Sequence, residues 1–455
     1  MVVQHNMQAA NANRMLNVTT SAQSKSTEKL SSGYKINRAA DDAAGLSISE
    51  KMRKQIKGLD KASSNAQDGV SAVQTAEGAL TEVHSMLQRM NELATQAANG
   101  TNSESDRSSI QDEIDQLTTE IDRVSETTKF NETYLLKGQS GTTNKYMAAH
   151  DAGFDGTLVD GDTKATFTMK IKAGESLKIG GTNYDIYATG SGVSDLQTEV
   201  GKLTANKEVT IDGTKYTVVD KAQVDEKANK LEASTIAAKI QAGSTVNLTP
   251  TDASKAVKAV DTSKPTSIDV ATATQKVTAE LQAANDIGAA DGKSTVTAGT
   301  ATADGTIEFA IQKGHASVAN TLSFNLHVGA DADSTNKITV NIDSMSTAGL
   351  GIKGLNVKDS TGTAATYAID AIADAISTVS SQRSSLGAVQ NRLEHTINNL
   401  DNVSENTTSA ESRIRDTDMA KEMVNYSKNN ILAQAGQSML AQANQSNQGV
   451  LSLLQ

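Results

Sequence analysis

Two stretches of the chain, residues 64–137 and 364–404, carry apolar residues at alternating spacings of three and four positions. In the first stretch these are Val73, Ala76, Leu80, Val83, Leu87, Met90 and Ala94, followed by Ile110, Ile114, Leu117, Ile121 and Val124. In the second they are Ile369, Ile372, Ile376, Val379, Leu386, Leu393, Ile397 and Leu400. Arg383 and Gln390 occupy the two places where this repeat lacks an apolar residue. So narrow an apolar seam predicts long helices that pair along it.

The first stretch is predicted to form two antiparallel helices. Asn99-Gly100 is typical of a left-handed helix C-cap. Ser103, followed three residues later by Asp106, is an acidic variant of the capping box that begins a helix. Because the connection between the two helices is short, they are expected to lie side by side. The C-terminal helix can then fill the groove between them.

Residues 141–321 differ from both helical regions and predict an α+β insert. Apolar and polar residues alternate around Gly180-Gly181 and again around Asp212-Gly213. Paired turn residues within alternating segments are typical of β-hairpins.

The two hairpins also match each other, IGGTNYDI at 179–186 against IDGTKYTV at 211–218. A helical pattern follows each of them, SDLQTEVGKLTA and then DEKANKLEASTIAAKI. We therefore expect a repeated strand–strand–helix unit. Strand patterns return at 303–328, and 329–345 is expected to form a further hairpin.

Both ends of the chain are compatible with helices but only weakly amphipathic. Residues 1–44 scatter their apolar side chains among Asn, Gln, Ser and Thr, and the last residues do the same before an apolar C-terminus. Packing supplies most of the stability of a helix, so such segments are marginal alone in water. An exposed apolar tail also requires a cover, either its own domain, a polymer or a chaperone.

Composition narrows the classes of function. The formal net charge of −11 argues against a nucleic-acid partner. A basic run of residues 25–61 is interrupted by acids, so we interpret it as a solvated or inter-subunit face. The chain has no Cys, which excludes disulfides and thiolate sites. No secretory signal is visible, and no apolar run is long enough for a membrane helix, so membrane insertion is not expected.

Four long runs in the terminal regions closely resemble bacterial flagellin. In the N-terminal region they are NRMLNVTTSAQSKSTEKLSSGYKINRAADDAAGLSISEKMRKQIKGLDKASSNAQDGVSAVQTAEGAL and LQRMNELATQAANGTNSESDRSSIQDEIDQL. In the C-terminal region they are LGAVQNRLEHTINNLDNVSENTTSAESRIRDTDMAKEM and LAQANQSNQGVLSLLQ. The matches cover nearly all of 1–140 and 364–455, whereas the insert carries no specific match.

The resemblance implies a structural protein that polymerises into the filament of the bacterial flagellum for motility. Residues 1–44 and 417–455 would form its inner tube. Residues 45–140 and 322–416 would form a helical rod with a β-hairpin in the outer tube. Residues 141–321 would be a surface-exposed insert. The fold class expected is therefore mainly α at the termini, with long paired helices in a coiled-coil-like bundle, and α+β in the insert.

The same resemblance implies the partners and the location. The chain would be secreted through the flagellar type III export apparatus to the extracellular flagellum, and an export chaperone would cover its C-terminal segment. Filament cap and hook-junction proteins would bind its polymer. No cofactor is expected.

Filament assembly is expected to depend on apolar residues at both ends of the chain. These are Met7, Leu16, Leu30, Met439, Leu440, Leu451, Leu453 and Leu454. Small residues such as Ala9, Ala12, Ala433 and Ala443 would let the terminal helices approach closely. Asp41-Asp42 is interpreted as a helix break or an inter-subunit contact.

The flagellin family also carries a segment recognised by the host Toll-like receptor 5, which matches Gln88, Arg89, Leu93 and Glu113 here. Arg89 and Leu93 are one helical turn apart, so an apolar anchor beside a charge could form a binding hot spot. The competing interpretation is that Leu93 belongs to the core and Arg89 serves filament packing.

Three other classes of protein were weighed. An enzyme is disfavoured because the six histidines are widely spread and no HExxH motif or phosphate-binding glycine pattern occurs. A hook–filament junction protein shares helical ends with flagellin and stays open as the alternative. A membrane-inserting translocator would need an apolar span that the chain lacks.

Overall fold

The computed structural model describes residues 6–188, 192–249, 257–259, 264–302, 304–359 and 361–452. The chain divides into two compact units. The first unit comprises residues 1–71, 325–339 and 388–455, and the second comprises residues 72–324 and 340–387.

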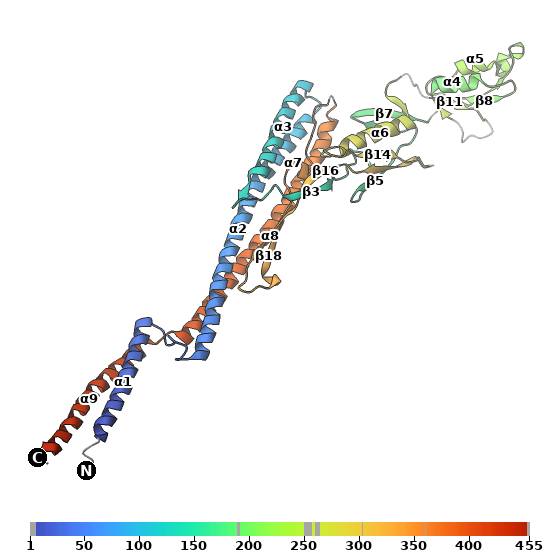
Figure 1. Ribbon diagram of the computed structural model, residues 1–455. Helices are drawn as coiled ribbons and strands as arrows, with labels where there is room; N and C mark the ends of the chain where they lie inside the picture. The colour runs from blue at the N-terminus through green and yellow to red at the C-terminus, as the bar shows by residue number, and fades with distance from the viewer. Residues whose placement is uncertain are drawn as a thin grey trace. The chain divides into compact units, whose positions relative to one another are not determined.

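Long helices come from the terminal regions and short ones from the insert (Figure 1). They are α1 (Met7–Ser32), α2 (Ala43–Ala97), α3 (Glu104–Thr127), α4 (Val193–Gly201), α5 (Ala233–Ala238), α6 (Val270–Asn285), α7 (Thr347–Leu350), α8 (Thr363–Arg415) and α9 (Met419–Ser452). Short 3-10 helices are η1 (Lys221–Gln223), η2 (Glu226–Ala228) and η4 (Ser334–Asn336). Helices α2 and α8 contain no proline, so no proline interrupts their hydrogen-bond ladders.

Within the described residues, the strands form six small sheets. The first half of the chain contributes β1 (Lys129–Phe130), β2 (Thr133–Tyr134), β3 (Gln139–Tyr146), β4 (Gly156–Asp160), β5 (Lys164–Lys170), β6 (Ser176–Ile179), β7 (Thr182–Tyr187), β8 (Glu208–Ile211) and β9 (Thr214–Val218). The second half contributes β10 (Lys230–Leu231), β11 (Thr245–Asn247), β12 (Val257–Lys258), β13 (Ser267–Asp269), β14 (Thr295–Ala298), β15 (Thr306–Gln312), β16 (His315–Asn320), β17 (Leu322–His327) and β18 (Lys337–Ile342). The sheet orders are β1-β2, β10-β9-β8-β11-β12, β13-β7-β6, β14-β15-β5-β4, β16-β3 and β17-β18.

The expected fold class is confirmed: long helices come from both termini and the α+β elements from the middle of the chain. Within the first unit, the initial part of α2 runs antiparallel to the final part of α8. The Ser63 hydroxyl donates to Asp401 Oδ1 at 2.9 Å, and the Ser404 hydroxyl donates to Asp60 Oδ1 at 2.7 Å. Residue numbers therefore rise along α2 in the direction in which they fall along α8, as they do in antiparallel helices.

The predicted seam of α2 is buried as expected, from Val73 to Ala94. The seam of α8 differs from the predicted one. Ala375 and Gln382 are buried there, whereas Ile376 is half-buried and Arg383 lies on the flank. A small residue, Ala375, and a hydrogen-bonded polar residue, Gln382, occupy these interior positions. The prediction missed them because it considered only large apolar residues. The Gln382 amide donates to the backbone oxygen of Asn341 at 3.0 Å, which satisfies its buried nitrogen.

The turn between α2 and α3 confirms one prediction and corrects another. Ser103 and Asp106 form the capping box of α3. The prediction of a left-handed C-cap at Asn99-Gly100 was wrong, because neither residue has a positive φ. The end of α2 is stabilised instead by the Arg107 guanidinium, whose Nε donates to the backbone oxygen of Ala97 at 2.9 Å. A cation placed at the exposed carbonyls of a helix end is favourable.

The hairpin expected within 329–345 supplies only one strand, β18, which pairs with β17. The loop between these strands packs on the first unit's helices: Val328 and Ile338 cluster with Ala66 and Leu393. The alternation of apolar and polar residues in 329–345 indicated a strand there. It gave no sign that the partner strand, β17, precedes residue 329.

The matching hairpins of the insert share backbone geometry. Gly180 and Gly181 have φ of 55° and 81°, and Asp212 and Gly213 have φ of 48° and 80°. Two successive residues with positive φ suit the tight turn of a two-residue hairpin. Hairpin β6-β7 and hairpin β8-β9 therefore turn in the same way.

The agreement extends beyond the hairpins to a third strand and a helix. Strand β13 lies parallel to β7 with Ile268 opposite Ile186, and β10 lies parallel to β9 with Leu231 opposite Val218. A helix follows each third strand, α6 after β13 and α5 after β10.

A lysine near each of these helices lies over the ring of a hairpin tyrosine. Lys276 Nζ is 5.1 Å from the Tyr184 ring, and Lys239 Nζ is 5.8 Å from the Tyr216 ring. The insert thus contains two copies of one hairpin–strand–helix unit, and the second copy lies inside the connection between β7 and β13 of the first.

This arrangement corrects the predicted repeat. The helix expected to complete the first hairpin, α4, belongs to the core of the second copy, where Leu196 and Val200 pack with Ile211. The first hairpin is completed by α6, whose Val277 and Leu281 pack with Phe167 and other residues of β4–β7, β14 and β15. Reading along the chain missed this helix because the second copy separates it from its hairpin.

We expect the second copy to be removable without unfolding the first. Residues 188–266 would be replaced by residues 219–229, the segment with which the second copy joins its own β9 to β10. The core around α6 shares no residue with the core around α5. The thermal midpoint of the remaining protein, followed by circular dichroism, should therefore move by less than about 4 °C.

A variant lacking residues 176–285 is the control, because it also removes α6 and should lose the cooperative transition of that core. A comparable loss in the shorter replacement would show that the two copies depend on each other.

Candidate functional site: the paired terminal helices

The two ends of the chain meet as the helix pair α1 and α9 (Figure 1). Their facing residues recur every three or four positions and are small, polar or of moderate size. On α1 they are Ala9, Ala12, Leu16, Thr19, Gln23, Ser26 and Leu30; on α9 they are Glu422, Tyr426, Asn429, Ala433, Gly436, Leu440 and Ala443. Of all these, only Ser26 and Ala433 are fully buried. The two helices therefore pair along this seam, but most of its side chains remain partly exposed.

Small side chains set the closeness of the pair. A Cβ at Gly436 would lie 3.4 Å from Leu16 Cδ1, so the leucine already fills the space over this glycine. At the far end, Asn6 Nδ2 donates to the backbone oxygen of Ala443 at 3.1 Å, while Asn6 Oδ1 accepts from the Ala9 amide and caps α1.

A second apolar face on α9 has no partner within the described residues. Val424 is 68% exposed and Ile431 67% exposed. They line a surface groove of about 630 Å³ with Ala420, Met423, Ser427, Lys428 and Leu432. On the same helix Met439 is also exposed, and Met7, Met15 and Val18 are exposed on α1.

The structure divides the expected assembly residues into two groups. Leu16, Leu30 and Leu440 are half-buried in the seam of the pair, whereas Met7 and Met439 are exposed. Met439 lines a surface pocket beside the seam with Ala12 and Ala443. The side chain of Leu451 and the residues Leu453 and Leu454 lie outside the described part of the chain.

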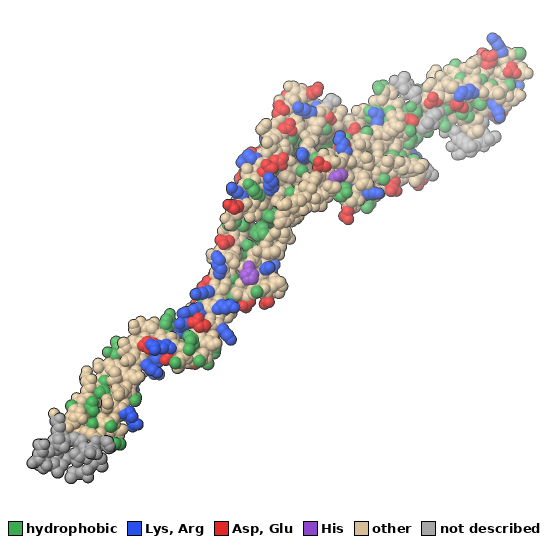
Figure 2. Space-filling view, in the orientation of Figure 1, with side chains coloured by type: hydrophobic (Ala, Val, Ile, Leu, Met, Phe, Trp, Pro, Cys, Tyr) green, Lys and Arg blue, Asp and Glu red, His purple; other side chains and the backbone are tan. Residues whose placement is uncertain are grey.

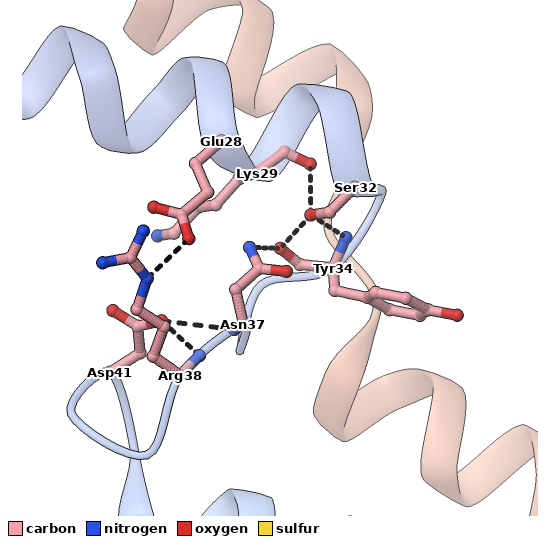
Figure 3. A network of polar contacts seen from close by, with 7 residues as sticks. All are labelled: Glu28, Lys29, Ser32, Tyr34, Asn37, Arg38 and Asp41. Atoms are coloured by element: carbon pink, nitrogen blue, oxygen red, sulfur yellow. Dashed lines mark hydrogen bonds and ion pairs between the residues drawn. The ribbon is translucent and has the colours of Figure 1, made fainter.

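A polar network ends α1 and shapes the segment that leads to α2 (Figure 3). Gly33 adopts a left-handed conformation with φ of 77°, and its amide donates to the backbone oxygen of Lys29. Arg38 Nε donates to Glu28 Oε1 at 3.0 Å, which ties the segment back to α1. The Asn37 side chain donates to the backbone oxygen of Tyr34 at 3.1 Å.

The acid pair Asp41-Asp42 breaks the helix, as one of its two interpretations predicted. Asp41 Oδ2 accepts from the amides of Asn37 and Arg38, and these hydrogen bonds lower the pKa of its carboxyl. Asp42 Oδ1 accepts from the Gly45 amide at 2.9 Å and so caps the start of α2.

Sequence reasoning missed a cluster around Arg415 that joins the two connecting segments. Its guanidinium lies 4.9 Å from the centre of the Tyr34 ring, and its Nη1 is 2.8 Å from Glu50 Oε1. The backbone pairs as well: the Lys35 amide donates to the Arg415 oxygen at 2.7 Å, and the Thr417 amide donates to the Gly33 oxygen at 2.9 Å. We call this group the Arg415 clamp.

The Arg415 clamp includes a nearly buried carboxylate. The Glu411 side chain is 11% exposed and lies between two guanidinium groups, 3.8 Å from Arg53 Nη2 and 4.0 Å from Arg415 Nη1. A carboxylate in such surroundings depends on its cations, because removal of one leaves charge uncompensated in a poorly hydrated place. The only feature of the sequence that pointed to this cluster was the basic run of residues 25–61. That run did not indicate which acidic residue its arginines would contact.

The residues matched to receptor recognition lie on α2 and α3 in the second unit. Arg89 Nε is 2.9 Å from Glu113 Oε1, and Arg89 Nη1 is 3.2 Å from Glu92 Oε2. The hydrogen bonds that Arg89 donates to Glu113 and Glu92 raise its pKa. Gln88 is exposed beside them. Leu93 is only 2% exposed, which favours a packing role for it over that of a surface anchor.

Other kinds of site find little support. In the part of the chain that the structure describes, no helix is long and apolar enough to cross a membrane. The described His, Asp and Glu side chains form no group of three that could hold a metal ion.

The comparisons with known proteins bear on both ends of the chain and on its whole length. The model of the bacterial flagellin N-terminal helical region matches residues 3–141, and that of the C-terminal helical region matches residues 369–454. A flagellin from Clostridium tyrobutyricum is 43% identical over 98% of this chain and 100% of its own length. The chain belongs to the bacterial flagellin family.

Further relatives agree. Flagellins from Bacillus subtilis and Halalkalibacterium halodurans are 37% and 35% identical over 100% of this chain and of their own lengths. These alignments also run through the insert, for which sequence motifs gave no match. Family membership makes the chain a structural subunit of the flagellar filament and places it in the flagellum.

Solved structures overlap with the chain only weakly. FliC from Burkholderia pseudomallei covers 71% of this chain and 99% of its own, with 21% identity and a TM-score of 0.25. Hook associated protein-3 from Legionella pneumophila covers 80% and 98%, with 17% identity and a TM-score of 0.34. Overlaps this small do not distinguish filament from junction proteins. Sequence identity does, and it favours the filament subunit over the hook–filament junction alternative.

We expect Arg415→Ala to loosen the connecting segments. The change removes the cation from the Tyr34 ring and leaves Glu411 with one guanidinium, at a cost of about 1–3 kcal/mol. Hydrogen exchange followed by mass spectrometry should show faster exchange at the Lys35 and Thr417 amides.

Arg413→Ala is the matched control, since Arg413 is exposed two residues away on the same helix. Equal exchange in the two variants would exclude the clamp as the source of this order.

Proposed function

We propose that the chain polymerises through the outward apolar faces of α1 and α9, which become the interior of the filament. The exposed row from Val424 to Met439 carries this proposal. A helix pair that covers one face of each helix and leaves the other apolar face in water is incomplete as a monomer. Neighbouring copies supply the missing cover.

The two groups of assembly residues would then have different tasks. Leu16, Leu30 and Leu440 hold the two ends of one chain together, whereas Met7 and Met439 contact adjacent copies. Leu451, Leu453 and Leu454 at the C-terminus are also proposed to take part in assembly. The polar partners in the seam keep the pair from burying its faces fully before assembly.

The assignment of tubes follows the connecting segments. Residues 1–44 and 417–455 form the inner tube, and the Arg415 clamp lies at this boundary. Residues 45–140 and 322–416 form the outer tube with the hairpin β17-β18. Residues 141–321 form the exposed insert. This role is mechanical, with no catalytic step.

The same outward face supports the proposed export partners. Before assembly, the apolar row of α9 requires a cover, which an export chaperone provides at the C-terminal segment. The absence of Cys fits a chain that crosses a narrow export channel unfolded and meets no disulfide. The chain is then secreted to the flagellum, where cap and hook-junction proteins contact its polymer.

Recognition by Toll-like receptor 5 is proposed for the exposed patch of Gln88, Arg89 and Glu113. Arg89 is held in a fixed orientation by two carboxylates, and its side chain is still 50% exposed. A pre-organised, accessible guanidinium is suited to a hot spot. Leu93 contributes from beneath by fixing the position of the helix.

Removal of residues 420–455 should abolish filaments and leave a soluble helical rod, because both the partner of α1 and the outward row are lost. Electron microscopy after addition of a filament seed gives the result. Filaments of normal length from this truncation would contradict the proposal.

Two further variants refine this test. Val424→Gln with Ile431→Gln alters only the outward face, so the seam should persist while the critical concentration for polymerisation rises at least about tenfold. The replacement of residues 188–266 described above is the matched control, and it should polymerise as the full chain does.

Arg89→Ala should weaken binding to the receptor ectodomain about tenfold, as measured by surface plasmon resonance. Its effect on folding should be small, because the ion pairs it breaks are exposed.

Arg123→Ala is the matched control: Arg123 is also an exposed arginine, paired with Glu120 on α3. Unchanged affinity of the Arg89 variant, or an equal loss in both variants, would refute the assignment.

A further inference from the structure

A row of lysines on the first unit lacks acidic partners. Lys54, Lys57 and Lys61 follow each other at three and four residues on α2, and all three are exposed. They lie on the side opposite to the buried Leu59, Ala62 and Ala66. Lys and Arg side chains gather over this part of α2 in Figure 2.

In the described part of the chain, no acidic side chain forms an ion pair with this row. No ion pair involves any of the three lysines. Of the acids next to them, Glu50 pairs with Arg415, whereas Asp60 accepts a hydrogen bond from the Ser404 hydroxyl and forms no ion pair with the lysines. Like charges at these helical spacings repel each other in the monomer. A partner of opposite charge would relieve that repulsion.

A matching acidic row occurs on α3, in the second unit. This helix carries eight carboxylates against two arginines. Most of the carboxylates have partners: Glu113 binds Arg89, Glu120 binds Arg123, Asp122 binds Thr347, Asp106 binds Ser103 and Glu126 binds Lys137. Glu104 and Asp112 form no ion pair within the described residues, and the Asp115 carboxylate accepts a hydrogen bond from the Gln111 amide.

The acidic residues left over form one exposed row along α3. Glu104, Asp112 and Asp115 point to a single side of the helix at 3.6 residues per turn. Asp112 and Asp115 are about 4.5 Å apart along the helix axis, as are Lys54 and Lys57. The two rows are therefore opposite in charge and both exposed, and each contains one pair of residues with this axial separation.

We propose that the lysine row Lys54, Lys57 and Lys61 of one copy docks against the acidic row Glu104, Asp112 and Asp115 of a second copy of this chain. The proposal rests on the polymerisation proposed above and names a contact within it. The contact is heterologous, because each copy offers a basic row on one unit and an acidic row on the other. Such an interface adds copies in series rather than closing a dimer.

Charge complementarity of this kind steers association and fixes register. Because both rows are exposed, their attraction is screened by salt: the Debye length falls from about 10 Å at 0.1 M to about 3 Å at 1 M. Polymerisation should therefore lose part of its drive as sodium chloride is raised. The apolar contacts of α1 and α9 should not weaken in the same way.

Charge reversal on either row tests the contact. The basic-row variant is Lys54→Glu with Lys57→Glu and Lys61→Glu. The acidic-row variant is Glu104→Lys with Asp112→Lys and Asp115→Lys. In seeded polymerisation at about 0.05 M salt, each should raise the critical concentration at least about tenfold, measured by sedimentation. At about 0.5 M salt the difference from the unchanged chain should shrink.

A chain with both rows reversed should regain polymerisation, because opposite charges face each other again. Lys221→Glu with Lys227→Glu and Lys230→Glu is the matched control, since it makes the same charge change on exposed lysines of the insert. Circular dichroism checks that each variant is folded. The control should polymerise as the unchanged chain does.

Three results would overturn the proposal. The basic-row variant could polymerise like the unchanged chain at low salt. The doubly reversed chain could fail to improve on the single reversals. The basic-row variant could instead lose only its retention on heparin, which would assign the row to an anionic polymer. If the unchanged chain itself failed to polymerise, the proposed function would be contradicted. This result differs from the three above, which contradict only the contact between the two charged rows.

Discussion

Shallow pairing of α1 and α9 is the constraint on which the rest of the molecule depends. The seam consists mainly of small and polar residues with a few Leu and one Tyr, and of these only Ser26 and Ala433 are buried. Apolar burial provides about 25 cal/mol per Å², so a seam of small residues contributes little. The remaining apolar side chains point outward. A monomer with this arrangement leaves apolar side chains in water, and the proposed assembly would cover them.

The Arg415 clamp is where this weak helix pair joins the longer helices of the first unit. Two connecting segments meet there through backbone hydrogen bonds, a cation over an aromatic ring and a row of alternating charges from Arg53 to Glu50. These interactions are polar and largely local. They can fix the course of the connecting segments without requiring a large core, which a chain with 3% aromatic residues could not provide.

The insert shows how a further structural unit can be added to the chain without a change in the long helices. The second hairpin–strand–helix copy lies in the connection between two parallel strands, a connection that must be long in any case. Each copy keeps its own core, around α6 and around α5. The charge rows on α2 and α3 lie outside the insert, so the surfaces proposed for assembly do not depend on its size.

Sequence alone determined the helical seam of α2, the capping box of α3, the two glycine turns and the membership of the family. These are local patterns, and short-range sterics and hydrogen bonding decide them. Only the tertiary structure decided the interior positions of α8, because Ala375 and Gln382 are interior through what faces them rather than through their own hydrophobicity. The pairing of β13 with β7 and the Arg415 clamp join residues distant in the chain, and no local period encodes such contacts.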